Sequence, residues 1–167
     1  NAGNSSELII VGSGGAWENY GTFNPGTGKV VFNHGVSSEI VTISGVTDFY
    51  DIEVGPNTTF QPVPGNLLRI ANVGSADPGG TSIIDFSSTD NTVEWNGTAN
   101  QTIVDPNGIG GNGGYFNLIL SGSGTKTMQN SVIHIAGDFS TQGSVTAIAQ
   151  NSIEIDNNMT IGTGSSF

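Results

Sequence analysis

The chain has 167 residues, of which 3 are basic and 14 acidic, so its formal net charge is −11. An acidic surface repels nucleic-acid phosphates and anionic lipid headgroups, which excludes nucleic-acid binding. No apolar run approaches the roughly 20 residues of a membrane span, so we expect no membrane insertion. Cysteine is absent, so no disulfide or thiolate metal site holds the fold. The chain does not open with a secretory signal pattern, and we expect an already processed or excised segment.

The polarity of the chain comes from amides and hydroxyls, since Gly, Asn, Ser and Thr fill 79 positions while charged residues make up only 10%. Val, Ile and Thr together supply 47 residues, far more than the strong helix formers. We therefore expect an all-β fold with almost no helix.

Short runs with strand character recur along the whole chain, each bounded by Gly, Asn, Pro or Ser. They cover residues 7–11, 29–33, 39–43, 49–54, 66–71, 82–86, 92–96, 115–120, 132–136 and 152–156. Evenly spaced short strands without helices are typical of a sandwich, a barrel or a solenoid. Internal repetition separates these architectures, because only a solenoid is built from stacked copies of one unit.

Three strand-like segments recur in the same order at offsets of 63, 66 and 65 residues: 29–33 with 92–96, 49–54 with 115–120, and 66–71 with 131–136. Strand side chains alternate between two faces, so the matches predict a ladder of inward-facing residues. This core ladder consists of Val30, Phe32, Ile52, Val54, Leu68, Ile70, Val93, Trp95, Leu118, Leu120, Ile133 and Ile135. The positions between them, including Phe49, Arg69, Tyr115 and His134, are predicted to face outward.

A longer repeat links the two ends of the chain, because residues 159–167 echo residues 9–17 at an offset of 150. We interpret residues 1–167 as a single solenoid segment. It would contain one super-repeat of about 150 residues, with half-repeats at roughly 17–85 and 86–158, plus the start of the next. A parallel β-solenoid with coils of about 20–25 residues fits this pattern, with Asn33 and Asn96 as candidate corner or ladder residues. An antiparallel β-sandwich is the alternative.

Longer phrases of the sequence resemble a known family. WENYGTFNPGTGKVVFN at 17–33, WNGTANQTI at 95–103 and YFNLILSGSGTKTM at 115–128 are similar to repeats of large secreted bacterial surface adhesins, especially those of Bacteroidota. The resemblance covers essentially the whole chain, although 105–114 is longer than the matching link and 73–90 has no counterpart. It implies a right-handed parallel β-helix that serves as an extracellular, cell-surface stalk or filament in cell adhesion or matrix formation. Its partner would be the next copy, end to end, with surface glycans as a further partner.

An enzyme is the main competing interpretation, because polysaccharide lyases and hydrolases of the pectin-lyase-like fold also use β-helices. Such sites need clustered carboxylates on one face. The only close outward pairs are Asp51 with Glu53 and Glu154 with Asp156, on strands of structural pattern. We therefore assign no catalytic, cofactor or metal residue, and expect His34 and His134 to be solvated. Calcium binding to the acidic surface stays open, without assignable ligands.

Exposed aromatic residues offer a third interpretation, a carbohydrate-binding β-helix module. Trp17, Phe49 and Tyr115 are the candidates for stacking on sugar rings, whereas Phe32 and Trp95 fit the core. The Thr-Lys-Thr at 125–127 contains the threonine pair of an ice-binding surface. A flat array requires the same pair on successive coils, and the sequence shows one copy.

Overall fold

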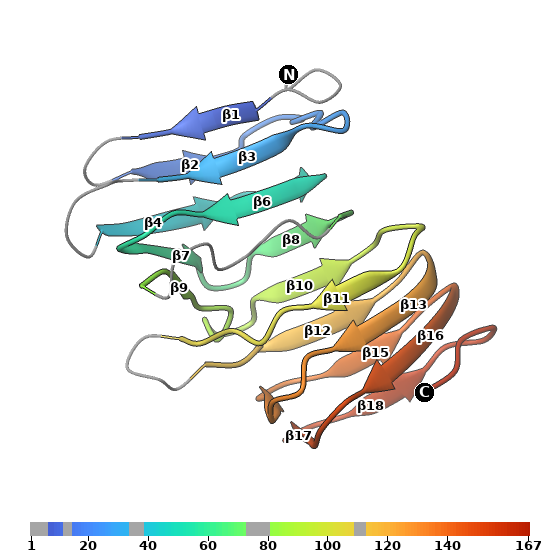
Figure 1. The fold of residues 1–167 in the computed structure, drawn as a ribbon. Helices are drawn as coiled ribbons and strands as arrows, with labels where there is room; N and C mark the ends of the chain where they lie inside the picture. Colours follow the sequence, from blue (N-terminus) through green and yellow to red (C-terminus); the bar gives the residue numbers. More distant parts are fainter. Residues whose placement is uncertain (1–6, 12–14, 34–38, 73–80, 109–112) are drawn as a thin grey trace.

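The computed structural model describes residues 7–11, 15–33, 39–72, 81–108 and 113–167. These residues form strands and turns without any helix, and every strand pairing is parallel. The strands stack along one axis as a parallel β-solenoid of about six turns (Figure 1). The predicted solenoid is confirmed, and the antiparallel sandwich is excluded, because a sandwich would pair its strands in opposite directions.

Each coil contributes strands to up to three faces. The longest face is a six-stranded sheet made of β5 (Thr47–Phe49), β8 (Leu67–Ile70), β10 (Thr92–Trp95), β12 (Asn117–Leu120), β15 (Phe139–Thr141) and β18 (Met159–Ile161). A second face carries β1 (Glu7–Ile10), β3 (Lys29–Phe32) and β6 (Asp51–Val54), and further along the axis β11 (Gln101–Ile103), β13 (Ser123–Met128) and β16 (Ser144–Ala149). The third carries β2 (Ala16–Glu18), β4 (Glu39–Ser44), β7 (Thr58–Pro62) and β9 (Ile83–Ile84), then β14 (Ile133–Ile135) and β17 (Ile153–Ile155).

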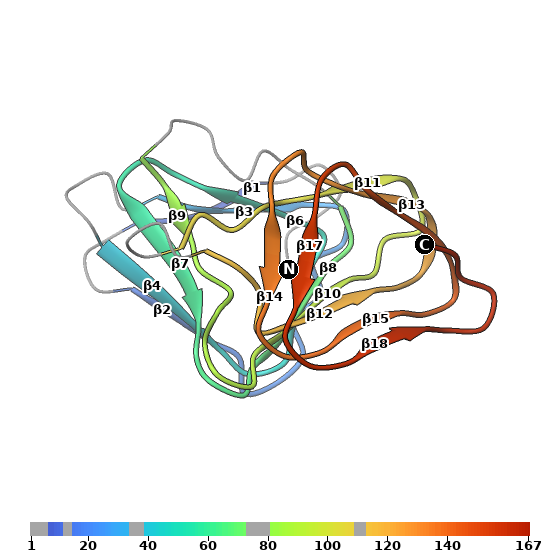
Figure 2. The same ribbon diagram turned by 90° about the horizontal axis from the view of Figure 1, so that it is seen from below.

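The coils match the expected length and hand. Leu68 pairs with Val93, Val93 with Leu118, and Leu118 with Phe139, so one turn takes 25, 25 and then 21 residues. Seen from the C-terminal end, the last coils run counter-clockwise as the chain advances toward the viewer (Figure 2). The solenoid is therefore right-handed.

The core fills the interior of the coils, and all twelve residues of the predicted core ladder are buried. In the six-stranded sheet, one inward column consists of Phe49, Ile70, Trp95, Leu120, Thr141 and Ile161. Its members repeat at the strand spacing of about 4.8 Å, so each apolar side chain packs on the coil before it and the coil after it. Burial of one such side chain contributes roughly 1.5–3 kcal/mol.

The matched half-repeats do not stack on each other, contrary to the expectation from sequence. β3 lies in the β1–β3–β6 sheet, whereas its sequence counterpart β10 lies in the six-stranded sheet, and β6 and β12 are separated in the same way. Three coils from Leu68 to Phe139 span 71 residues, more than the offsets of 63–66. Counterparts thus share their inward pattern but lie on neighbouring faces. β1 and β18, which open the two ends of the 150-residue match, are also in different sheets.

Glycine turns the chain at the corner after the six-stranded sheet. Gly122 and Gly143 have φ of +81° and +76°, the left-handed region that glycine enters without steric cost. A Cβ on Gly143 would lie 2.6 Å from the carbonyl oxygen of Gly122, one coil earlier. Asn33 and Asn96, the predicted ladder residues, are followed one coil later by Gly55 and Ser121, so they form no asparagine ladder.

Candidate functional site

The aromatic candidates for sugar stacking are largely inside the molecule. Phe49 and Tyr115 are 1% and 0% exposed, so the prediction that they face outward is wrong. The chain bends at Tyr50 and at Phe116, directly after each ring, and the alternation of the following strand restarts there. The sequence-based prediction continued one alternation across both bends.

Trp17 is half-buried and belongs to an aromatic cluster at the N-terminal end of the core. Its ring centroid lies 4.8 Å from that of Phe23 and 5.1 Å from that of Phe49, both edge-to-face. The indole Nε1 donates a hydrogen bond to Thr47 Oγ1 at 3.2 Å. Tyr115 in turn donates its hydroxyl proton to the carbonyl oxygen of Val104 at 2.6 Å, and burial raises its pKa. These contacts give the rings structural roles.

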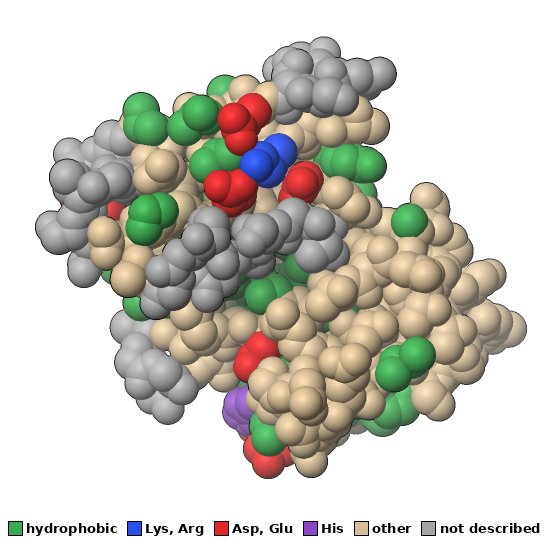
Figure 3. Space-filling model, in the orientation of Figure 1, with side chains coloured by type: hydrophobic (Ala, Val, Ile, Leu, Met, Phe, Trp, Pro, Cys, Tyr) green, Lys and Arg blue, Asp and Glu red, His purple; other side chains and the backbone are tan. Residues whose placement is uncertain are grey.

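Two cations on the outer surface join three successive coils each. Lys29 Nζ lies 2.5 Å from Glu53 Oε2 on one neighbouring coil and 3.2 Å from Glu7 Oε1 on the other. Hydrogen bonds to these carboxylates, that of Glu53 first, raise the pKa of Lys29. Figure 3 shows this cation, in blue, between carboxylates in red near the N-terminal end. The arrangement fastens neighbouring coils together.

Arg69 repeats this arrangement on the six-stranded sheet. Its Nη1 lies 3.1 Å from Asp48 Oδ1 on the preceding coil, and its Nε lies 2.9 Å from Glu94 Oε2 on the following coil. Hydrogen bonds to Asp48 and then Glu94 raise the Arg69 pKa. The charge pairs thus follow the axis of the solenoid.

The carboxylate pairs considered for catalysis are tied into such contacts. Glu53 is held by Lys29, and Asp156 Oδ2 lies 3.0 Å from His134 Nε2. Among the described residues, no cluster of three or more His, Asp or Glu side chains could hold a metal ion. His34 lies outside the described residues.

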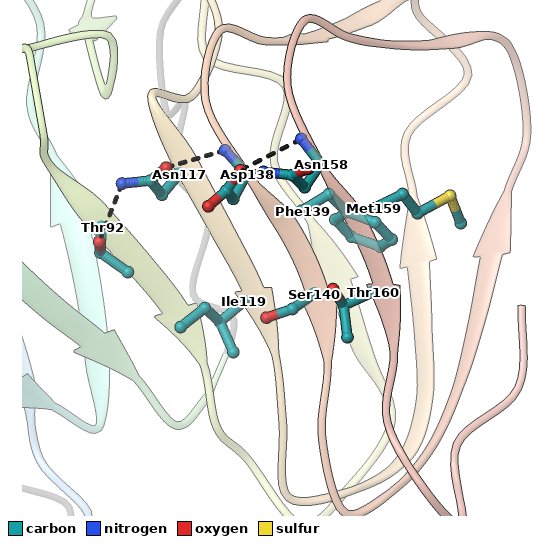
Figure 4. Close-up of a pocket in the computed structure, with 9 residues that line it drawn as sticks. All are labelled: Thr92, Asn117, Ile119, Asp138, Phe139, Ser140, Asn158, Met159 and Thr160. Carbon is teal, nitrogen blue, oxygen red and sulfur yellow. Dashed lines mark hydrogen bonds between the residues drawn. The ribbon is translucent and has the colours of Figure 1, made fainter.

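The best-formed depression is a shallow polar groove on the outer surface of the six-stranded sheet, with a volume of about 490 Å³. It crosses β10, β12, β15 and β18, and its polar side chains come from the same two positions of successive strands (Figure 4). The groove is lined by Thr92, Asn117, Ile119, Asp138, Phe139, Ser140, Asn158, Met159 and Thr160. The sequence-based prediction missed it. Its signal is an Asn or Asp directly before an inward apolar residue, at 117, 138 and 158.

A hydrogen-bonded ladder forms one wall of the groove. Asn117 Nδ2 donates to Thr92 Oγ1 at 3.3 Å, and the backbone amide of Asp138 donates to Asn117 Oδ1 at 2.9 Å. Asp138 Oδ1 accepts from both the backbone amide and Nδ2 of Asn158, at 3.1 and 3.0 Å. One carboxylate oxygen therefore fixes the following coil. The opposite oxygen, with the Ser140 and Thr160 hydroxyls, offers the acceptor and donor set that sugar hydroxyls use.

Lys126 is an interior feature that sequence did not predict. It points inward from β13 with no exposed surface, and its Nζ donates to the carbonyl oxygen of Gly97 at 2.6 Å and to Gln101 Oε1. Desolvation lowers its pKa from 10.5 to about 8. Its ammonium bonds the backbone of the corner one coil earlier, and no carboxylate among the described residues pairs with it.

Comparisons with known proteins identify no relative: no family model, no curated protein and no solved structure matches the chain. A search of the described residues for a helix able to span a membrane finds none.

Proposed function

We propose that the chain is a non-enzymatic structural segment of an extracellular filament or adhesin stalk, in which coils continue end to end along one axis. The hydrogen-bond ladders, the inward apolar columns and the Lys29 and Arg69 ion pairs all connect neighbouring coils in the same direction. An element built in this way transmits a load along its axis, because each coil is held by its two neighbours.

The observation that carries the proposal is the state of the two terminal coils. Met159 and Ile161 occupy the inward columns at the C-terminal end, yet they are 47% and 42% exposed because no further coil covers them. Leu8 occupies the corresponding place at the other end and is 38% exposed. β1 and β18 are also edge strands with unpaired backbone groups. An edge of this kind accepts a further parallel strand, so we propose that one coil of a second copy covers each end.

Electron microscopy of the purified chain over a range of concentrations tests this. We expect thin rods that lengthen with concentration and have the width of one solenoid. Ile161→Glu places a charge on the terminal coil and should abolish lengthening, since a buried unpaired carboxylate is costly. Val132→Glu is the matched control, because Val132 is 50% exposed and lies outside the terminal coil. Compact particles at every concentration, or rods that Ile161→Glu leaves unchanged, would contradict the proposal.

A carbohydrate-binding function is the second candidate, favoured by the polar groove and not by the aromatic residues. The groove follows successive coils and presents Asp138, Ser140 and Thr160 at its surface. We propose that it holds part of an extended, hydroxyl-rich sugar chain. Binding to a glycan array that is lost in Ser140→Tyr, which fills the groove, and kept in Thr146→Tyr, on a different sheet, would support this function. Absence of binding in the unmodified chain would exclude it.

A further inference from the structure

The outer surface of the β11–β13–β16 sheet carries hydroxyl side chains in register. Thr102 on β11 lies beside Thr127 on β13, and Thr125 on β13 lies beside Thr146 on β16. The second column continues to Ser166 through a parallel bridge, and Ser123 lies beside Ser144 in a third. The structure thus extends the single threonine pair at 125 and 127 to neighbouring coils, which the sequence alone did not reveal.

This surface is free of charge in a chain with a net charge of −11. The outward positions of β11, β13 and β16 are Thr or Ser, except Ile148. The single charged residue of these strands, Lys126, is turned into the interior. In Figure 3, the region over β13 and β16 shows neither acidic nor basic side chains, whereas charges gather elsewhere on the same side.

The array has two fixed spacings. Neighbouring strands lie about 4.8 Å apart, and outward residues two apart along a strand are separated by roughly 6.6 Å. Stacking in register keeps such a sheet flat. The hydroxyls of Thr102, Thr125 and Thr127 have no hydrogen-bond partner among the described residues, whereas that of Thr146 accepts from Ser166 at 3.3 Å. Each threonine also presents a methyl group.

We propose that this hydroxyl array, defined as Thr102, Ser123, Thr125, Thr127, Ser144 and Thr146, binds ice. Oxygen atoms on the faces of hexagonal ice repeat in two directions at distances close to the two spacings of the array. Hydroxyls held at those spacings can take lattice positions, and the methyl groups lie between them. A flat array that repeats in two directions fits a ligand that does the same.

Other occupants fit the array less well. A single sugar chain repeats in one direction only and is held in a groove or against aromatic rings, and none of the described strands of this sheet has an outward aromatic residue. A second sheet packed face to face would need interdigitating apolar side chains, but Ile148 is the single large apolar residue at the outward positions. The proposal needs no end-to-end assembly and does not rest on the proposed stalk function.

Ice-crystal shaping and thermal hysteresis, the gap between melting and growth temperatures, test the inference on the purified chain. We expect faceted crystals and a measurable gap for the unmodified chain. Thr127→Tyr places a large ring in the middle of the array and should abolish both, and Thr146→Tyr should do the same on the next coil. Thr160→Tyr is the control, since Thr160 is an exposed strand residue of the six-stranded sheet.

Each outcome decides the proposal. Circular dichroism at the assay temperature establishes that the variants are folded, and the unmodified chain tests the proposal even where a variant fails to fold. Round ice crystals and no hysteresis with the unmodified chain would overturn the proposal. Full activity in folded Thr127→Tyr and Thr146→Tyr, or loss of activity in Thr160→Tyr alone, would also overturn it. Binding to a polysaccharide that disappears in Thr127→Tyr, without any effect on ice, would show that the array has a glycan ligand instead.

Discussion

Ile70 lies directly beside Trp95 in the same inward column, one coil apart, and both side chains are buried. Phe49 precedes them and Leu120 follows them in that column. A stack of this kind makes the stability of each coil depend on its neighbours, as expected for a quasi-one-dimensional repeat protein.

Truncation of the stack should therefore be costly. We expect Ile70→Ala to lower the free energy of unfolding by about 2–5 kcal/mol, because it leaves a cavity between Phe49 and Trp95. Ile119→Ala is the control, since Ile119 points outward from the neighbouring coil β12 and is half-buried. Chemical denaturation measures both. Equal losses for the two variants would argue against the inward column as the main source of stability.

The corner glycines give a second, steric prediction. Gly143→Ala introduces a Cβ at positive φ and 2.6 Å from the Gly122 carbonyl oxygen, whereas Gly65→Ala introduces one at a similar φ of +71° with no atom within 4 Å. The left-handed conformation alone costs about 1 kcal/mol, and we expect Gly143→Ala to lose clearly more than that. Thermal melting of both variants separates the two contributions. Equal destabilisation would show that the coils are not closely stacked at this corner.

Much of the fold follows from sequence because the physical signals are local. All ten predicted strand segments contain strands, since alternating apolar residues between Gly, Asn and Pro are strong signals. The segments that were missed, such as β13 and β15, are polar or very short. Phe49 and Tyr115 were assigned to the wrong face because a bend restarts the alternation, which no periodicity reveals. The groove and the hydroxyl array depend on which coils lie side by side, and the internal repeat predicted the wrong neighbours.

Charge pairs between coils should contribute modestly. Replacing Arg69 with Met removes contacts to Asp48 and Glu94 while keeping an apolar chain of similar length. We expect a loss of about 1 kcal/mol at low ionic strength, and a smaller loss in about 1 M salt because partly exposed pairs are screened. Urea denaturation at two salt concentrations measures this. A loss that grows with salt would contradict an electrostatic origin.

Lys126 should make stability depend on pH in the alkaline range. Its pKa falls from 10.5 to about 8 on folding, so between these values the unfolded chain binds a proton that the folded chain has released. The free energy of unfolding contributed by this group therefore rises as the pH increases from about 8 toward 10.5. Below this range the folded state retains the proton and its desolvation cost.

Lys126→Met isolates that contribution. The difference in free energy of unfolding between the unmodified chain and Lys126→Met should shift in favour of the unmodified chain between about pH 7.5 and about pH 9.5. Denaturation at the two pH values measures it, and the other titrating groups cancel in the difference. A difference that is independent of pH would show that the Lys126 pKa is not lowered by burial.

X-ray diffraction from aligned fibres of the chain is the most direct test of axial stacking as the basis of its function. Strands that lie across the axis and coils that continue from one copy to the next predict a sharp reflection at about 4.8 Å along the fibre direction. A reflection at about 4.8 Å perpendicular to the fibre direction, or a chain that forms no fibres at any concentration, would contradict the proposed stalk.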